Sequence, residues 1–455
     1  MSPLPRVILA APATGQGKTT VATGLMAALA ATGRAVSGHK VGPDYIDPGY
    51  HSLACARPGR NLDPHLVGEA MIAPLLLHGA AHPTPADIAV IEGVMGLYDG
   101  RIAGNGFSST AHVAALTRTP VVLVVDISAS SRSIGALVHG MATWDPSVEV
   151  VGVILNQAGS PRHVEEVRAS ISLPVLGAIP RDPSIATPSR HLGLVTAAER
   201  GGAEEVVTRL AEVITEHVDL DAVVALAAAA PALDAAAWSP NAPALTDVPS
   251  APATAPTGPV VAVAAGRAFT FHYAETTELL SAHGLAVVEF DPAHDTALPA
   301  GTAGLYLGGG FPERHAGDLA ANAAMLGQVR EAVGDGLPTV AECGGLLYLC
   351  RSLDGATMAG VIEADATMSQ RLTLRYPVAT SPADTLLTRA GEQVTGHEFH
   401  RTSISPAHGP VPAWSIDGDT VGFASPTLHA SYLHTHWAGH PQLAHRFAAA
   451  VHHYG

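Results

Sequence analysis

The sequence predicts two α/β domains in tandem, each built around a sheet of mainly parallel strands. Short apolar runs rich in β-branched residues alternate with helix-forming segments through most of the 455 residues. Polar residues suited to chemistry follow the ends of several of these runs, as they do in open α/β sheets. A proline-rich stretch interrupts the alternation near the middle, and a chain of this length is expected to form two or three domains.

Six strands are expected in the first half, nearly continuous in apolar residues as buried parallel strands are. They span Val7–Ala10, Ala35–Lys40, Ile88–Ile91, Val121–Val125, Val150–Leu155 and Val175–Ile179. A glycine-rich loop, Glu92, Asp126 and Asn156 follow four of them directly. Since ligands of such sheets bind at the carboxyl ends of the strands, we expect these residues to lie near one site.

Prolines recur from Ala235 to Pro259, where neither a helix nor a strand ladder can be sustained. We therefore expect a first domain over residues 1–234, a linker over 235–258 and a second domain over 259–455. The second domain repeats the α/β pattern and ends in a tail rich in strand and turn signals. Its expected strands are Val260–Ala264, Ala286–Phe290, Gly304–Leu307 and Thr339–Ala341.

Charge and composition exclude several classes of partner. The formal net charge is −16, which disfavours the backbone of a nucleic acid and the surface of an anionic membrane. No apolar run reaches the ~18 residues of a membrane span, and we expect no signal peptide. The three cysteines, Cys55, Cys343 and Cys350, do not make a disulfide framework. We therefore expect a reducing, cytoplasmic setting.

The loop after the first strand is a variant of the phosphate-binding pattern G-x-x-x-x-G-K-[ST], with Pro12 in place of the first glycine. A helix-forming run, Val21–Ala31, follows it. In that frame the loop and the helix N-terminus hold phosphates, and the residues concerned are Thr14, Gly15, Gln16, Gly17, Lys18, Thr19 and Thr20. Lys18 is expected to reach the terminal phosphates of ATP, and Thr19 to ligate Mg²⁺. The alternative is a glycine-rich turn that only opens a helix.

Lysine is rare in this chain. Lys and Arg total 24, yet Lys18 and Lys40 are the only lysines. Arg presents a planar fork whereas Lys is a compact point charge, so two retained lysines suggest a geometric need at those positions. Lys40 opens the segment Lys40–Pro48, whose carboxylates Asp44 and Asp47 suit Mg²⁺ and phosphate. Asp also favours turns for local reasons, which is the alternative here.

Glu92 ends the third expected strand and precedes a glycine-rich run that contains Asp99. A carboxylate at the end of a strand beside a phosphate loop is the usual position of a metal-directing acid. Asp126, at the end of the next strand, competes for this role, and one of the two is expected only to cap a helix. We favour Glu92 because glycines after it allow a substrate to approach the backbone.

Cys343 lies between a strand and Gly344-Gly345, with a helix expected over Leu346–Cys350. This is the pattern of a nucleophile elbow, in which the thiol sits at a helix N-terminus that favours thiolate. The N–H of Gly344 is a candidate oxyanion donor, and a second glycine turn offers Gly309 and Gly310. A buried structural cysteine is the alternative, and we assign that role to Cys350.

A thiol nucleophile needs a histidine base from a distant segment. If Ser431–His436 forms one strand, His434 and His436 share a face of it; one can then face the thiol while the other orients it, and we favour His434 as the base. The segment Gly396–His400 has the spacing H-E-x-H, one residue short of the zinc pattern H-E-x-x-H. We expect no zinc there.

Together these motifs resemble the cobyrinic acid or hydrogenobyrinic acid a,c-diamide synthases, which are glutamine-dependent corrin-ring amidotransferases. The resemblance runs nearly end to end. Its motifs are Ala11–Thr20, Lys40–Pro48, Asn61–Asp63, Glu92–Asp99, Arg190–Leu194, Gly308–Glu313, Glu342–Gly345, Gly396–His400 and Ala430–Trp437. It implies an N-terminal P-loop-type, dethiobiotin-synthetase-like domain with a parallel sheet, followed by a class I glutaminase domain of flavodoxin-like fold.

The resemblance also implies ATP and Mg²⁺ as cofactors, L-glutamine as the nitrogen donor and a corrinoid or tetrapyrrole polycarboxylate as the substrate. Cys343 becomes the glutaminase nucleophile, with His434 or His436 as its base. The usual class I triad has Glu two residues after the base; if His434 is the base, His436 stands there, which leaves the third member open. Candidates for phosphate, metal and substrate contacts are Lys40, Asp44, Tyr45, Asp47, Glu92 and Asp99, and Asn156 is a candidate for adenine contact.

Several alternatives stay open at this point. Cobyric acid synthase and nickel-sirohydrochlorin a,c-diamide synthase share both domain types. From other classes, the chain fits a ParA-like ATP-driven switch with an inactive glutaminase domain, or a non-enzymatic metal binder. A homodimer is compatible with the sequence. The residues do not decide between the cobalt-containing and the metal-free ring.

Overall fold

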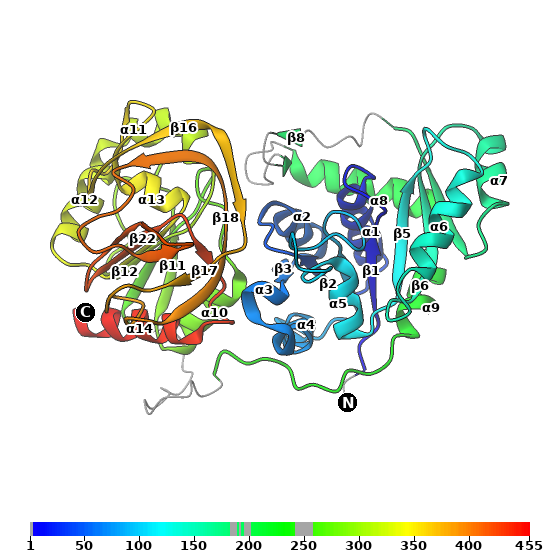
Figure 1. Cartoon of the computed structure of the whole chain (residues 1–455), viewed down its shortest axis with the longest axis horizontal. Coiled ribbons are helices and arrows are strands. Elements are labelled where there is room, and N and C mark those ends of the chain that lie inside the picture. The colour runs from blue at the N-terminus through cyan, green and yellow to red at the C-terminus, as the bar shows by residue number, and fades with distance from the viewer. Residues whose placement is uncertain (1–2, 183–188, 191–192, 195–201, 242–257) are drawn as a thin grey trace. The chain divides into compact units, whose positions relative to one another are not determined.

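The fold is described from a computed structural model of the chain, which covers residues 3–182, 189–190, 193–194, 202–241 and 258–455. The chain divides into two compact units, Met1–Ser239 and Pro240–Gly455 (Figure 1). Most of the expected linker, and His191 and Leu192 of the Arg190–Leu194 motif, lie outside the described residues.

The first unit contains a seven-stranded sheet in the order β3-β2-β4-β1-β5-β6-β7. Every neighbouring pair in it is parallel. All six expected strands are confirmed, with small differences at their ends. The strands are β1 (Arg6–Ala10), β2 (Val36–Val41), β3 (Arg60–Leu62), β4 (Ile88–Glu92), β5 (Val121–Asp126), β6 (Val150–Ala158) and β7 (Val175–Pro180). A short pair, β8 (Ser189–Arg190) with β9 (Gly193–Leu194), lies outside this sheet.

Helices connect these strands, as parallel strands require, and the last two helices of the unit follow β7. The helices are α1 (Lys18–Ala31), α2 (Ile46–Cys55), α3 (Pro64–Val67), α4 (Ile72–Ala81), α5 (Thr110–Thr117), α6 (Ser133–Thr143), α7 (Pro161–Arg168), α8 (Ala203–His217) and α9 (Leu220–Ala228), with a 3₁₀ turn η1 (Glu69–Met71). Helix α1 is buried over most of its length because it packs against both α2 and α8. Its N-terminus is thereby fixed at the end of β1.

The first unit extends past residue 234, the end expected from the sequence. Trp238 donates its backbone N–H to the carbonyl of Pro74, and its own carbonyl lies 3.0 Å from Nδ1 of His78. The indole ring also meets the His78 ring edge-on. The start of the proline-rich stretch is therefore packed on the first unit.

The second unit contains a six-stranded sheet in the order β11-β10-β12-β13-β22-β21. Its first five strands pair in parallel, and β21 joins antiparallel at one edge. The five parallel strands follow the flavodoxin-like order 2-1-3-4-5. The strands are β10 (Val260–Ala264), β11 (Ala286–Phe290), β12 (Thr302–Leu307), β13 (Thr339–Glu342), β21 (Phe423–Ala424) and β22 (Leu428–Ser431), and all four expected strands are among them.

A second, mostly antiparallel sheet accounts for the strand-rich tail. Its long hairpin pairs β16 with β18. The strands are β14 (Cys350–Leu353), β15 (Ala356–Thr357), β16 (Ile362–Arg375), β17 (Val378–Thr380), β18 (Gln393–Ser405), β19 (Trp414–Ile416), β20 (Asp419–Val421) and β23 (His434–Thr435). The helices of the unit are α10 (Ala274–Ala282), α11 (Ala316–Ala321), α12 (Ala323–Gly334), α13 (Gly344–Leu349) and α14 (Pro441–Tyr454), with a 3₁₀ turn η3 (Pro312–Arg314).

Two local expectations about the second unit were wrong. Cys350 does not continue the helix after the nucleophile, because α13 ends at Leu349 and Cys350 begins β14. Ser431–His436 is not one strand: β22 ends at Ser431, and the two-residue β23 pairs with β18 instead. His434 and His436 are therefore not placed on a common strand face.

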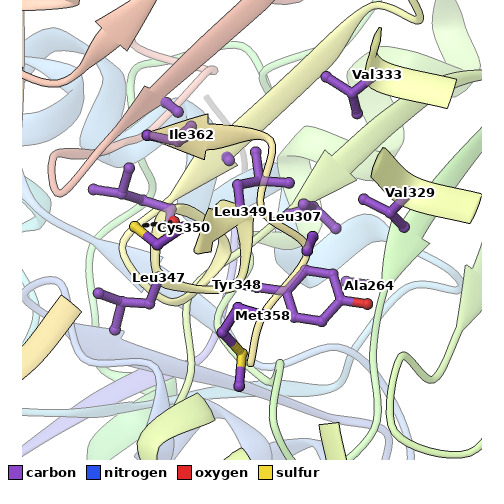
Figure 2. Close-up of a cluster of buried hydrophobic side chains, with 14 of the residues drawn as sticks. Ala264, Leu307, Val329, Val333, Leu347, Tyr348, Leu349, Cys350, Met358 and Ile362 are labelled. Carbon is purple, nitrogen blue, oxygen red and sulfur yellow. Dashed lines mark hydrogen bonds between the residues drawn. The ribbon is translucent and has the colours of Figure 1, made fainter. Parts of the chain in front are cut away.

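A hydrophobic cluster between α12, α13 and the sheet supports the segment that carries Cys343 (Figure 2). Leu346, Leu349 and Cys350 are fully buried in it. The Cys350 thiol donates to the carbonyl of Leu346, and burial raises its pKa to about 12. Cys350 thus has the structural role that the sequence predicts.

Candidate active sites

The phosphate loop lies where the sequence predicts it, between β1 and α1. Gly17 adopts a left-handed conformation with φ 87° immediately before the helix, which glycine tolerates at no steric cost. A Cβ atom there would also lie 2.3 Å from Nδ2 of Asn156. The turn therefore admits only glycine at position 17. The backbone N–H groups at the start of α1 point toward the loop.

Two neighbouring strand ends hold the loop in this shape. Nδ2 of Asn156 donates to the carbonyl of Gln16 at 2.9 Å, and Oε1 of Gln16 accepts the N–H of Asp126 at 2.8 Å. The carboxylate of Asp126 accepts the N–H of Ser128 and so caps the turn after its own strand. Asp126 therefore fixes a turn and does not cap a helix, since the next helix, α6, begins at Ser133, and Asn156 braces the loop.

A buried polar cluster lies at the ends of β2 and β4, beside the start of α1. Nζ of Lys40 is 2.6 Å from Asp47 and 2.8 Å from Glu92. The hydroxyl of Thr19 donates to Glu92 at 2.6 Å and lies 3.3 Å from Asp47. His51 contacts the other oxygen of Glu92 at 2.7 Å. The structure therefore brings together Thr19, Lys40, Asp47 and Glu92, which the sequence placed in separate motifs.

Burial governs the electrostatics of this cluster. Burial alone would lower the pKa of Lys40, but Asp47 and Glu92 outweigh it and raise that pKa above its usual value. Burial would raise the pKa of Glu92, but Lys40 and His51 lower it below the usual range. Burial and the neighbouring carboxylates raise the pKa of Asp47 well above its usual value. A further cation beside Asp47 would favour the charged form of its carboxylate.

Lys18 is also mostly buried. Its Nζ donates to the carbonyl of Met95 at 2.5 Å, in the glycine-rich run after Glu92. Burial, together with the charge of Lys40, lowers the pKa of Lys18 to about 8. An anionic ligand would favour the charged form of this lysine.

The remaining candidates in the first unit support the backbone around the cluster. Oδ1 of Asp44 accepts the N–H groups of Ile46 and Asp47, which fixes the start of α2. Oδ2 of Asp99 accepts the N–H of Gly96 at 3.0 Å. Tyr45 is half-buried just before α2.

The second site is built around Cys343, which follows β13 and precedes α13. Its backbone has φ 46° and ψ −96°, an unusual conformation for a residue other than glycine. Strain of this kind marks nucleophile elbows. Its N–H donates to the carbonyl of Ser431, which ties the turn to β22. The thiol is largely buried, at 6% exposure.

The glycine turn after β12 lies against this elbow. The N–H of Gly309 donates to the carbonyl of Phe271, so Gly309 is not an oxyanion donor, contrary to our expectation. The N of Gly310 lies 3.0 Å from the position that a Cβ on Gly344 would take. Gly310 and Gly344 therefore approach each other closely and remain the candidates for the oxyanion site.

Two buried histidines in the segment after β22, His434 and His436, have different neighbours. His434 forms a hydrogen bond with Cys343, and its Nδ1 lies 3.6 Å from Oε2 of Glu342. Burial would lower the pKa of His434, but Cys343 and Glu342 raise it to about 10. His436 instead stacks on Tyr273 and lies 3.6 Å from Glu275. The geometry supports His434, rather than His436, as the base.

Comparisons with known proteins agree with this division of the chain. A family model described as the CobQ/CobB/MinD/ParA nucleotide binding domain matches residues 7–195, and one described as the CobB/CobQ-like glutamine amidotransferase domain matches residues 260–442. Hydrogenobyrinate a,c-diamide synthase of Thermobifida fusca (strain YX) is 59% identical over 98% of this chain and 97% of its own length. The chain belongs to the a,c-diamide synthase family.

Other members of the a,c-diamide synthase family match over the same span. Hydrogenobyrinate a,c-diamide synthase of Streptomyces coelicolor is 52% identical over 98% of this chain and 97% of its own length. Cobyrinate a,c-diamide synthase of Dehalococcoides mccartyi (strain CBDB1) is 39% identical over 97% of each. The two-domain α/β fold predicted from the sequence is confirmed.

Two residues that lie at these sites were missed in the sequence. His51 stands four positions after Asp47 and so shares its face of α2, a spacing that could have indicated it. Glu342 ends an apolar strand directly before Cys343, just as Glu92 ends β4. The rule that selected Glu92 would therefore have selected Glu342 as well.

Proposed function

We propose that this chain amidates the a and c acetate carboxylates of hydrogenobyrinic acid, using ATP for activation and glutamine as the source of nitrogen. The observation that carries the proposal is one chain with both an assembled phosphate-loop cluster and an assembled Cys343–His434 pair. Its full-length similarity to hydrogenobyrinate a,c-diamide synthases, 59% and 52%, exceeds the 39% to a cobyrinate a,c-diamide synthase. The higher identity to the hydrogenobyrinate enzymes favours hydrogenobyrinic acid, the metal-free ring, as the substrate.

In the first unit, activation begins with the attack of a substrate carboxylate oxygen on the γ-phosphorus of ATP. ADP leaves and an acyl phosphate forms, which gives the carboxyl group a leaving group. Lys18 and the backbone N–H groups at the start of α1 stabilise the charge that develops on the phosphate oxygens. Ammonia then attacks the acyl carbon, phosphate departs, and a primary amide remains after loss of a proton.

The residues at the cluster fit Mg²⁺, because hydroxyl and carboxylate oxygens are its preferred ligands. Thr19, Asp47 and Glu92 would hold it, and its charge would favour the charged form of Asp47. Among the described residues, no group of three or more His, Cys, Asp or Glu is arranged to hold a metal. This agrees with an ion that is also held by substrate phosphates and water. When bound, Mg²⁺ would supply charge neutralisation at the phosphates.

In the second unit, His434 accepts the proton of the Cys343 thiol, and the thiolate attacks the carboxamide carbon of glutamine. The N–H groups of Gly310 and Gly344 are the proposed donors to the resulting oxyanion. The imidazolium returns its proton to the leaving nitrogen, ammonia departs, and a thioester stays on Cys343. Water then hydrolyses the thioester to glutamate and the free thiol. Ammonia released in this way is unprotonated and can act as a nucleophile, whereas free ammonia in solution at neutral pH is mostly protonated to ammonium.

Two coarser features complete the proposal. No helix among the described residues is long and apolar enough to cross a membrane. Cys55, Cys343 and Cys350 are all free thiols, and we propose a reducing cytoplasmic setting for the enzyme.

Mass spectrometry tests the proposal directly. The protein would be incubated with ATP, Mg²⁺, glutamine and either hydrogenobyrinic acid or cobyrinic acid. We expect two carboxyl-to-amide conversions, faster with hydrogenobyrinic acid. Faster conversion of cobyrinic acid would reassign the ring, and no conversion of either ring would refute the amidation of this substrate class. ATP hydrolysis that depended on a protein partner and ignored glutamine would favour the ParA-like switch instead.

A further inference from the structure

Glu342 is a buried carboxylate next to the nucleophile in sequence and next to the base in space. It is the last residue of β13 and is 4% exposed. Its Oε2 lies 3.6 Å from Nδ1 of His434, which is within ion-pair range. A carboxylate that is removed from water needs a partner of this kind, because an isolated buried charge is costly.

The Glu342 carboxylate is held in place by neutral donors. Oε1 accepts the hydroxyl of Thr435 at 2.8 Å and the Thr435 N–H at 3.3 Å. Oε2 accepts the hydroxyl of Tyr306 at 3.3 Å, and burial and Glu342 raise the pKa of this phenol well above its usual value. The phenol therefore stays a donor. These bonds satisfy the carboxylate without neutralising it, so its charge remains available to His434.

The position that a class I triad would use for its carboxylate serves another purpose in this chain. His436 stands two residues after His434, stacks on Tyr273 and lies near Glu275. The carboxylate that pairs with His434 therefore comes from another element of the fold, the end of β13.

We propose that Glu342 is the positioning residue that completes a Cys343–His434–Glu342 arrangement for glutamine hydrolysis. The inference rests on the glutaminase activity proposed above. Glu342 favours the tautomer with the proton on Nδ1, which leaves Nε2 free to accept the thiol proton, and it stabilises the imidazolium that results. The proton stays on the imidazole, as in the serine–histidine–aspartate triad.

Several charged or titratable groups face His434. Cys343 lies on the elbow after β13 and Glu342 at the end of that strand. From β18, His397 stacks on the His434 ring at 4.8 Å, and burial, with a smaller effect of His434, lowers the pKa of His400 to about 4. Glu342 is thus the carboxylate paired with this imidazole among the described residues. Its removal should lower the pKa at which the imidazolium loses its proton.

The test compares Glu342→Gln with Glu275→Gln, a matched change of the buried carboxylate that pairs with His436 at the same 3.6 Å. Glutaminase kcat and KM are measured from pH 6 to 11 for both variants and the unchanged protein. For Glu342→Gln we expect kcat to fall about 100-fold with little change in KM. The alkaline limb of the pH–rate profile reports loss of the proton from the His434 imidazolium that forms when the thiol is deprotonated. We expect this limb to move to lower pH in Glu342→Gln. Glu275→Gln should leave that limb in place.

Ammonia-dependent amidation is the control for folding, because it does not use the thiol site. Glu342→Gln should retain it. If this variant does not fold, Glu342→Asp, which keeps the charge, replaces it and should keep the alkaline limb near its original pH while kcat falls. An unchanged kcat and limb in Glu342→Gln, or an equal effect of Glu275→Gln, would overturn the assignment. Failure of the unchanged protein to hydrolyse glutamine would instead refute the proposed function.

Discussion

The ammonium group of Lys40 lies 2.8 Å from the carboxylate of Glu92, and both side chains are buried. The two residues come from adjacent parallel strands, where Lys40 and Glu92 are register partners. The pairing therefore follows directly from the sheet topology. It also fixes one oxygen of Glu92 beside Thr19, at the start of α1. A single carboxylate thus links the phosphate loop to the neighbouring strand.

Replacing Glu92 by Gln should abolish the ATP-dependent half of the reaction. The neutral amide keeps the shape but removes the charge that would hold Mg²⁺, and we expect amidation to fall at least about 100-fold. The loss should be equal with ammonia and with glutamine as nitrogen source, whereas glutaminase activity of the second unit should remain. Amide formation by mass spectrometry and glutamate release measure the two halves separately. Amidation at the original rate would remove Glu92 from the site.

Cys343→Ala and Lys18→Ala should separate the two nitrogen sources. Without the thiol, glutamine-dependent amidation is lost but ammonia-dependent amidation continues, since the phosphate site is unchanged. Without Lys18, both are lost because the charge on the transferred phosphate is no longer stabilised. The measurement is the rate of amide formation with each nitrogen source in turn. Continued use of glutamine by Cys343→Ala would show that the nucleophile is another residue.

The strands, and the position of each motif at a strand end, could be predicted from the sequence, because buried parallel strands leave a continuous apolar signal. The sequence motifs predict Thr19, Lys40, Asp47 and Glu92 as site residues. Their convergence could not be derived, because it depends on which strands are neighbours.

The base and its carboxylate were harder to predict. The strand expected over Ser431–His436 gave His434 and His436 equivalent positions, but β22 ends at Ser431 and each histidine finds its own carboxylate. The role of Gly309 could not be predicted either, because its N–H donates a hydrogen bond to the carbonyl of Phe271, thirty-eight residues earlier in the chain. Such long-range hydrogen bonds leave no periodic signal in a sequence.

Gly309→Ala should disable the glutaminase without affecting the ATP half. A Cβ at this position would lie 2.4 Å from Cε1 of His434 and 3.2 Å from the side chain of Phe271. Because His434 is buried and stacked on His397, it cannot move away freely. We expect glutaminase kcat to fall at least about tenfold, since displacement of a base by even 1 Å is costly. Gly317→Ala, where a Cβ meets no atom within 4 Å, is the control and should leave kcat unchanged.

His429 should make the stability of the second unit depend on pH. It is buried on β22 against Trp414, and burial lowers its pKa to about 4. The unfolded chain, with an ordinary pKa near 6.5 for histidine, binds the proton more readily. Stability is therefore unaffected by His429 above about pH 6.5 and falls as the pH drops toward 4, with a loss of about 2 kcal/mol at pH 5.

His429→Phe keeps an aromatic ring against Trp414 but cannot titrate, so unfolding measured by calorimetry between pH 5 and 7.5 should lose part of its pH dependence. Some dependence should remain, because burial also lowers the pKa of His400 to about 4. The exposed His453 serves as the control: His453→Phe should leave the slope as it is. A slope that stays the same in His429→Phe would mean that His429 takes up its proton equally well in the folded and unfolded chain.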